Sequence, residues 1–72
     1  MWVLGRWNTF YQEVEDVDWR DKEDDVRETL QIWIEDEYAN KNIDSYSEEY
    51  DADLEMTVIT VNKDEFYIWE EK

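Results

Sequence analysis

The sequence has no cysteine, no histidine and no proline, and Gly5 is its only glycine. Without cysteine there are no disulfides, no thiolate metal sites and no thiol nucleophile. Without histidine, no side chain with an ordinary pKa changes its charge between about pH 5 and pH 8, so the usual pH switch is excluded. Because a secreted domain of this size usually carries disulfides, the expected compartment is the cytoplasm.

Long apolar runs and basic residues are also scarce. No run approaches the roughly 18 apolar residues that cross a membrane, and the N-terminal residues do not follow a signal-peptide pattern. Seven Lys and Arg face 22 Asp and Glu, which gives a formal net charge of −15. This charge disfavours direct binding to nucleic acid or to an anionic membrane. It also exceeds the about 2–8 charges that keep a small domain soluble, and like charges destabilise a compact state, so solubility alone does not account for it.

What the sequence does contain is aromatic and apolar residues. Apolar residues make up 42% of the 72 residues and aromatics 17%, which is far above the content of a disordered acidic tail. A chain of this length builds one core and not two. We therefore expect a single folded acidic domain over residues 1–72.

Apolar residues at spacings of three and four predict one amphipathic helix, from about Asp21 to Asn40. They are Val26, Leu30, Trp33, Ile34 and Tyr38. Asp21 is the expected N-cap, with Asp24 three residues later as a weak form of the capping box. Asn40 and Asn42 are expected to end the helix in the left-handed conformation.

The remaining elements are predicted as strands. β-branched and aromatic residues, with turn residues at Asn62-Lys63-Asp64, predict strands at Trp2–Trp7, Leu54–Val61 and Glu65–Glu70. Residues 10–17 fit either a strand, which we favour, or a short helix. Residues 43–53 have the composition of an exposed acidic loop. The predicted fold is α+β, with a small antiparallel sheet (ββαββ, or βαββ without the second strand) packed on one helix.

The acidic residues gather between positions 13 and 28 and between positions 44 and 55. On the helix, Asp24 and Glu28 are like charges four residues apart, an arrangement that destabilises a helix by a few tenths of a kcal/mol. Such a row has a rise of about 6 Å per step, comparable to the spacing of DNA phosphates, and a groove lined with Lys and Arg would attract it. The alternative interpretation is a solvated face, for instance in a salt-adapted organism.

The residues expected to contact a partner are these acids together with one face of the C-terminal hairpin. The acids are Asp21, Asp24, Asp25, Glu28, Glu35, Asp36, Glu48, Glu49, Asp51 and Asp53. Alternation places Ile59, Val61, Phe66 and Ile68 on one face of the hairpin and Met56, Val58, Tyr67 and Trp69 on the other. One helix covers one face only, so the second face is expected to be an aromatic patch, with Trp2 or Trp7 beside it, for a heterologous partner or a second copy of the chain.

Metal binding and catalysis are not expected. Residues 44–53 lack the Asp-x-Asp-x-Asp-Gly pattern and the glycine of a calcium loop. Pairs of acidic residues recur throughout residues 13–37 and 44–55, so no pair stands out for acid–base chemistry. We therefore expect a protein without a cofactor that is not an enzyme.

In size, acidity, lack of cysteine and α+β pattern, the chain resembles the DNA-mimic inhibitors of phages and mobile elements. That class includes uracil-DNA glycosylase inhibitors, anti-restriction proteins and some anti-CRISPR proteins. The resemblance is compositional and includes no family motif; the glycosylase inhibitors are the most similar, since they combine an acidic edge with an apolar pocket. It implies an inhibitor in the host cytoplasm that occupies the basic DNA-binding groove of a DNA-processing or defence enzyme, above all uracil-DNA glycosylase. The alternative is an acidic immunity protein that neutralises a cognate toxin.

Overall fold

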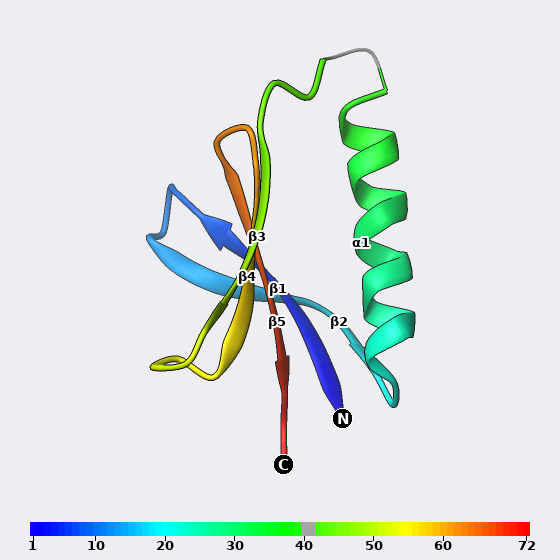
Figure 1. The fold of residues 1–72 in the computed structure, drawn as a ribbon, viewed down its shortest axis with the longest axis vertical. Helices are drawn as coiled ribbons and strands as arrows, with labels where there is room; N and C mark the ends of the chain where they lie inside the picture. Colours follow the sequence, from blue (N-terminus) through cyan, green and yellow to red (C-terminus); the bar gives the residue numbers. More distant parts are fainter. Residues whose placement is uncertain (40–41) are drawn as a thin grey trace.

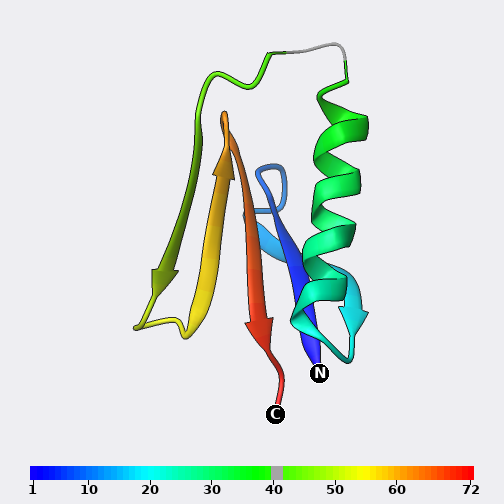
Figure 2. The same ribbon diagram turned by 45° about the vertical axis from the view of Figure 1, so that its right-hand side comes forward.

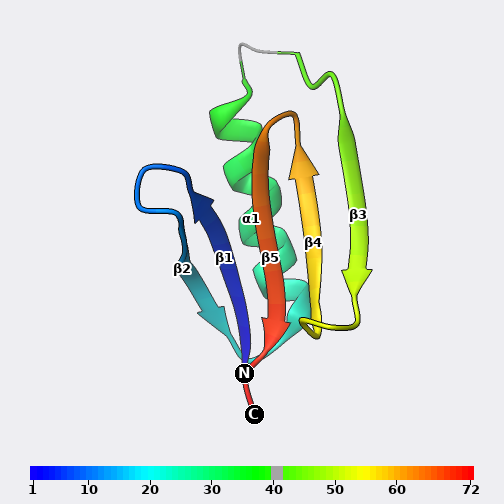
Figure 3. The same cartoon turned by 90° about the vertical axis from the view of Figure 1, so that its left-hand side faces the viewer.

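The computed structural model describes residues 1–39 and 42–72, which form five antiparallel strands and one helix (Figure 1). The elements are β1 (Trp2–Asn8), β2 (Glu13–Arg20), α1 (Glu23–Glu37), β3 (Tyr46–Asp51), β4 (Met56–Val61) and β5 (Asp64–Glu70). The strand order across the sheet is β2-β1-β5-β4-β3, and the two chain ends lie side by side (Figure 3). The α+β class with a small antiparallel sheet is confirmed, and the element order is ββαβββ.

The helix covers one face of the sheet, and the core lies between the two layers (Figure 2). Val26 and Leu30 on the helix and Tyr38 at its C-cap are buried, as the periodicity predicts. The predicted inner face of the C-terminal hairpin is confirmed as well, because Ile59, Val61, Phe66 and Ile68 are all at most 1% exposed. No described helix is long and apolar enough to cross a membrane.

The start of the helix differs from the expectation. The helix begins at Glu23, and Lys22, not Asp21, occupies the N-cap position without a side-chain hydrogen bond. The capping box from Asp21 to Asp24 is therefore wrong, because β2 ends at Arg20 and leaves only two residues to reach the helix. Three acids in the first turn still face the positive end of the helix dipole. At the other end, α1 stops at Glu37 with Tyr38 as its C-cap, so the predicted extension to Asn40 is wrong. Asn40 itself lies outside the described residues, and Asn42 lies beyond the helix end and does not cap it.

Residues 10–17 were expected to continue a hairpin as a strand, and β2 confirms a strand that starts at Glu13. Pairing of β1 with β2 shifts by one residue between Leu4 and Gly5, which leaves Val17 as the extra residue of a bulge. Val17 packs against the core, and neighbouring Asp18 accepts a hydrogen bond of 2.7 Å from Thr29 on the helix. The bulge thus directs two consecutive residues of β2 toward the helix.

The acidic loop expected over residues 43–53 is wrong in its central part, which forms the edge strand β3. Every residue of β3 pairs with β4, from Tyr46 opposite Val61 to Asp51 opposite Met56. The composition is poor in strand-forming residues, but the neighbouring strand supplies the hydrogen bonds, and charged residues are common on edge strands because they prevent further pairing.

Asn62 in the β4–β5 turn fixes the segment that leads into β3. Its backbone is in the left-handed region at φ 54°. Its side-chain oxygen accepts hydrogen bonds from the backbone N–H groups of Asp44 (2.8 Å) and Ser45 (3.1 Å), and its amide nitrogen donates to the carbonyl of Asn42. The turn that joins β4 to β5 therefore also aligns β3 at the sheet edge.

Candidate functional site

The surface of α1 that faces away from the sheet is acidic, and we call it the acidic helix surface. Its members are Asp24, Asp25, Glu28, Glu35 and Asp36, all of them exposed. Within the described residues, none of these five carboxylates is in an ion pair. Ile32 lies among them with 57% of its surface exposed, one turn after Glu28. The surface thus combines negative charge with an exposed apolar side chain, which the sequence-based prediction overlooked.

Three arginines bind acids elsewhere and so leave the acidic helix surface unneutralised. Arg6 binds Glu37 at 2.8 Å and lies 5.8 Å from the ring centres of both Trp33 and Phe66. Arg27 binds Glu48 on β3 at 3.0 Å, and this hydrogen bond is the main cause that raises the Arg27 pKa.

Arg20 binds Asp18 at 3.0 Å. Burial by itself raises the pKa of Asp18. The hydrogen bond from Thr29 and the hydrogen bond and charge of Arg20 outweigh this effect and hold the pKa below its ordinary value. Arg6 and Arg27 therefore join the helix to strands β1 and β3, whereas Arg20 pairs within its own strand β2.

The density of net charge is close to that of a nucleic acid. The molecule measures 37 × 23 × 22 Å, so the net charge of −15 corresponds to about one charge per 2.5 Å of the long axis. Duplex DNA carries about one charge per 1.7 Å of its axis. The two values agree within a factor of two.

The second group of predicted acids is divided between two faces of the sheet. Glu48 lies on the face that the helix covers, since it pairs with buried Ile59 and binds Arg27. Glu49 and Asp51 lie on the opposite face, next to Val58 and Met56 respectively. Asp53, also a predicted contact residue, is exposed in the β3–β4 turn, where its backbone N–H donates to Asp51. These acids therefore do not form one continuous surface with the helix acids.

The sheet face away from α1 is the outer face, which no described element covers (Figure 3). Its apolar members, assigned from the strand pairing, are Val3, Trp7, Val14, Trp19, Met56, Val58, Tyr67 and Trp69. Trp7 belongs to this face, while Trp2 packs against the core on the helix side. Trp19 is 58% exposed, whereas Tyr67 is buried by its neighbours on the sheet. Burial, followed by its hydrogen bond to Glu65, raises the pKa of Tyr67 to about 12.

The predicted contact residues therefore occupy two opposite sides of the molecule. The helix and the sheet form two layers (Figure 2), and the acidic helix surface lies on the outside of the helix layer. The strand pairing places Met56, Val58, Tyr67 and Trp69 on the outside of the sheet layer. The acids that adjoin the outer face are Asp16, Glu49, Asp51 and Glu65. A partner that binds the acidic helix surface needs an apolar contact on the helix side of the sheet.

A groove between α1 and β3 supplies such an apolar contact. It has a volume of about 490 Å³ and is lined by Leu30, Ile34, Ile43 and Tyr46, with Glu35 of the acidic helix surface at its border. Ile43 and Tyr46 are about half exposed. The sequence-based prediction missed this groove, because it assigned both residues to a loop.

The β1–β2 turn presents a second exposed aromatic feature. Phe10 is 85% exposed and Tyr11 65% exposed, and their rings meet edge to face at 5.0 Å. Asn8 shapes the turn, because its side-chain oxygen accepts hydrogen bonds from both backbone N–H groups. A turn that holds two aromatic rings in solvent through hydrogen bonds of its own is suited to contact with a partner.

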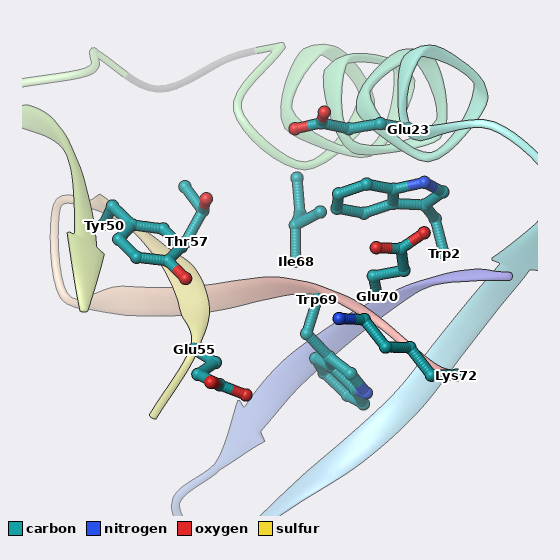
Figure 4. A pocket seen from close by; sticks show the side chains of 9 residues that line it. All are labelled: Trp2, Glu23, Tyr50, Glu55, Thr57, Ile68, Trp69, Glu70 and Lys72. Atoms are coloured by element: carbon teal, nitrogen blue, oxygen red, sulfur yellow. The ribbon is translucent and has the colours of Figure 1, made fainter. Parts of the chain in front are cut away.

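A pocket of about 300 Å³ lies at the end of the sheet where α1 begins, mostly on the helix side, with Trp69 reaching it from the outer face (Figure 4). Its lining residues come from β1, α1, β3, β4, β5 and the segments that follow β3 and β5. They are Trp2, Glu23, Tyr50, Glu55, Thr57, Ile68, Trp69, Glu70 and Lys72. Aromatic rings and carboxylates thus line the same cavity. Among the described residues, no group of three acidic side chains is arranged to hold a metal ion.

Comparison with protein-family models, with curated proteins and with solved structures finds no match to this chain. Its function is therefore argued from the surfaces described above.

Proposed function

We propose that the protein is an inhibitor that mimics DNA and occupies the basic DNA-binding groove of a DNA-processing or defence enzyme. The observation that carries this proposal is the acidic helix surface, whose five exposed carboxylates have no ion-pair partner among the described residues. Stacked like charges weaken an isolated helix, so a partner that supplies positive charge would relieve a cost that the protein carries alone. The charge density along the long axis suits a groove that accepts phosphates.

Apolar contacts beside the carboxylates would give the complex a slow dissociation rate. Surface ion pairs are screened within about 8–10 Å at physiological salt and contribute little each. Ile32 within the acidic helix surface and the groove at Ile43 and Tyr46 lie on the same side of the molecule as the acids. Charge would steer the encounter, and these apolar groups would select the target.

The first target to test is uracil-DNA glycosylase, with excision of uracil from DNA as the readout. The protein should compete with the DNA substrate, and inhibition should weaken steeply as salt rises. If this enzyme is not inhibited, a pull-down from a bacterial lysate at low salt, eluted with a salt step and identified by mass, would supply the target for the same competition assay. A target that binds the protein and DNA simultaneously would contradict the proposal.

Two variants with the same change in charge test the role of the helix. The first replaces Asp24 and Asp25 by Asn and Glu28 by Gln, and we expect association to slow by roughly tenfold while the fold is retained. The control replaces three acids of the edge strand β2, none of them on the acidic helix surface: Glu13 and Glu15 by Gln and Asp16 by Asn. If the control slows association equally, net charge and not the helix determines binding.

A second function, an immunity protein that neutralises a cognate toxin, draws support from the exposed aromatic pair at Phe10 and Tyr11. Tight binding to one partner relies on such anchors more than on charge. Replacement of both residues by Ser would abolish binding in that case, while neutralisation of the helix acids would have a minor effect. An immunity gene would also lie beside the gene for its toxin.

A further inference from the structure

The pocket of Figure 4 combines two features that recognise an organic cation. Trp2 and Tyr50 contribute aromatic rings, and Glu23, Glu55 and Glu70 contribute carboxylates. Aromatic faces attract cations through the ring quadrupole, and they do so most strongly for Trp. Three carboxylates around one cavity exclude an anion as its ligand.

Strand pairing holds the walls of this pocket in place. Tyr50 lies opposite Thr57, and Thr57 lies opposite Ile68, so these three residues form one row across β3, β4 and β5. Two residues after Ile68 on β5, Glu70 lies opposite Trp2 of β1. All five belong to the face that α1 covers, and Glu23 in the first turn of α1 completes the pocket from the helix side. The walls are therefore built on regular elements and are preformed.

The hydrogen bonds at the pocket show which carboxylates are available. Glu23 already accepts a hydrogen bond from Arg27 at 3.2 Å. Within the described chain, Glu55 and Glu70 make neither a side-chain hydrogen bond nor an ion pair. Among the described residues, Lys72 is the one cation that lines the pocket, and its ammonium group would compete with a ligand. Glu55, in the β3–β4 turn, and Glu70, at the end of β5, are thus available to accept hydrogen bonds from a ligand.

We propose that this pocket binds the guanidinium group of an arginine side chain on a partner protein. A guanidinium is planar, stacks on an aromatic ring and donates hydrogen bonds in several directions. The Trp2 ring supplies the stacking surface, because Tyr50 lies three strands away across the sheet, and Glu55 and Glu70 supply two separated acceptors. A metal ion does not fit, because the described acidic side chains do not converge closely enough to hold one. The volume of about 300 Å³ is at the lower end of ligand pockets and accommodates a side chain rather than a larger cofactor. That the arginine belongs to a DNA-binding enzyme rests on the proposed function, whereas the guanidinium site itself does not.

The test titrates the full chain with Nα-acetyl-arginine methylamide and follows the Trp2 indole N–H by NMR. The matching lysine and citrulline compounds serve as comparisons, since citrulline has nearly the same shape without the charge. We expect saturable binding of the arginine compound in the millimolar range, weaker binding of the lysine compound and no binding of citrulline. Equal responses to arginine and lysine, or to arginine and citrulline, would overturn the proposal.

Variants locate the binding site. Glu70→Gln should weaken binding of the arginine compound by about threefold to fivefold, the upper part of the range expected for one exposed ion pair. Glu28→Gln, which removes the same charge from the acidic helix surface, should leave it unchanged, and Lys72→Ala should strengthen it. Equal effects of Glu70→Gln and Glu28→Gln would show a response to net charge and refute the pocket. If Glu70→Gln does not fold, Glu55→Gln decides in its place.

Failure of this inference is distinguishable from failure of the proposed function. An arginine compound that binds the pocket while the protein does not compete with DNA for any target would contradict DNA mimicry alone. Competition with DNA that persists in Glu55→Gln and Glu70→Gln, without binding of the arginine compound, would refute the pocket alone.

Discussion

Replacement of Gly5 by Ala tests whether the outer face is packed as tightly as the structure indicates. A Cβ atom at this position would lie 2.7 Å from Cγ1 of Val14 and 2.8 Å from Cζ3 of Trp69. Carbon atoms in contact are ordinarily about 3.5–4.0 Å apart, so each neighbour would have to move by about 1 Å. Gly5 does not have a positive φ, so the close approach and not backbone conformation requires glycine here.

The magnitude follows from two opposing effects. Overpacking of this kind costs about 1–3 kcal/mol, since a Trp ring and a Val side chain are rigid. Alanine in place of glycine in a strand gains about 0.5–1 kcal/mol, because less backbone entropy is lost on folding. We therefore expect Gly5→Ala to lower the free energy of unfolding by about 1 kcal/mol, which corresponds to a decrease in Tm of about 4–8 °C for a domain of this size.

Urea denaturation followed by Trp fluorescence measures this change, provided that the m value, the slope of the free energy of unfolding against urea concentration, stays the same. Trp69→Leu supplies the control, because a flexible side chain can move away from the new methyl group. In that background the cost of Gly5→Ala should fall by about 0.5 kcal/mol or more. If Gly5→Ala is as stable as the parent protein, the packing of Trp69 and Val14 over β1 is not as the structure describes.

Three further perturbations test the interior and the charge. Burial and the hydrogen bond to Asp64 raise the pKa of Tyr38 to about 12, and burial and the hydrogen bond to Glu65 do the same for Tyr67. An absorbance titration should therefore show two tyrosines that ionise well above pH 10. Because these phenols ionise near pH 10 in the unfolded chain, their contribution to stability should be constant below that pH and be lost as pH rises from about 10 to 12. Tyr38→Phe should reduce that loss, and an unchanged alkaline transition would contradict the assignment. Arg6→Met should cost about 1–3 kcal/mol in urea denaturation, since it leaves Glu37 half-buried without its partner, and the double variant with Glu37→Gln should recover part of it. Tm should rise between 10 mM and 500 mM NaCl because salt screens like charges, and a Tm that falls with salt would contradict self-repulsion at −15.

The sequence by itself determined the elements whose pattern is local. The spacing of Val26, Leu30 and Tyr38 predicts the buried helix face because residues three and four apart share a face wherever the helix lies. Alternation at Ile59 and Phe66 predicts the buried side of the hairpin for the same reason. The exposure of the helix acids follows directly from that periodicity.

Only the tertiary structure decided where these surfaces lie relative to one another. Strand β3 exists because β4 pairs with it, although four of its six residues are Ser, Glu or Asp. The placement of Trp2 toward the helix and Trp7 away from it depends on which side of β1 the helix covers.

The two-layer arrangement puts the acidic helix surface and the aromatic outer face on opposite sides. The pocket of Figure 4 and the groove between α1 and β3 are assembled from segments far apart in the chain. A single sequence specifies the period of each element, whereas pairing between distant strands depends on all of them folding together, and this pairing creates both cavities.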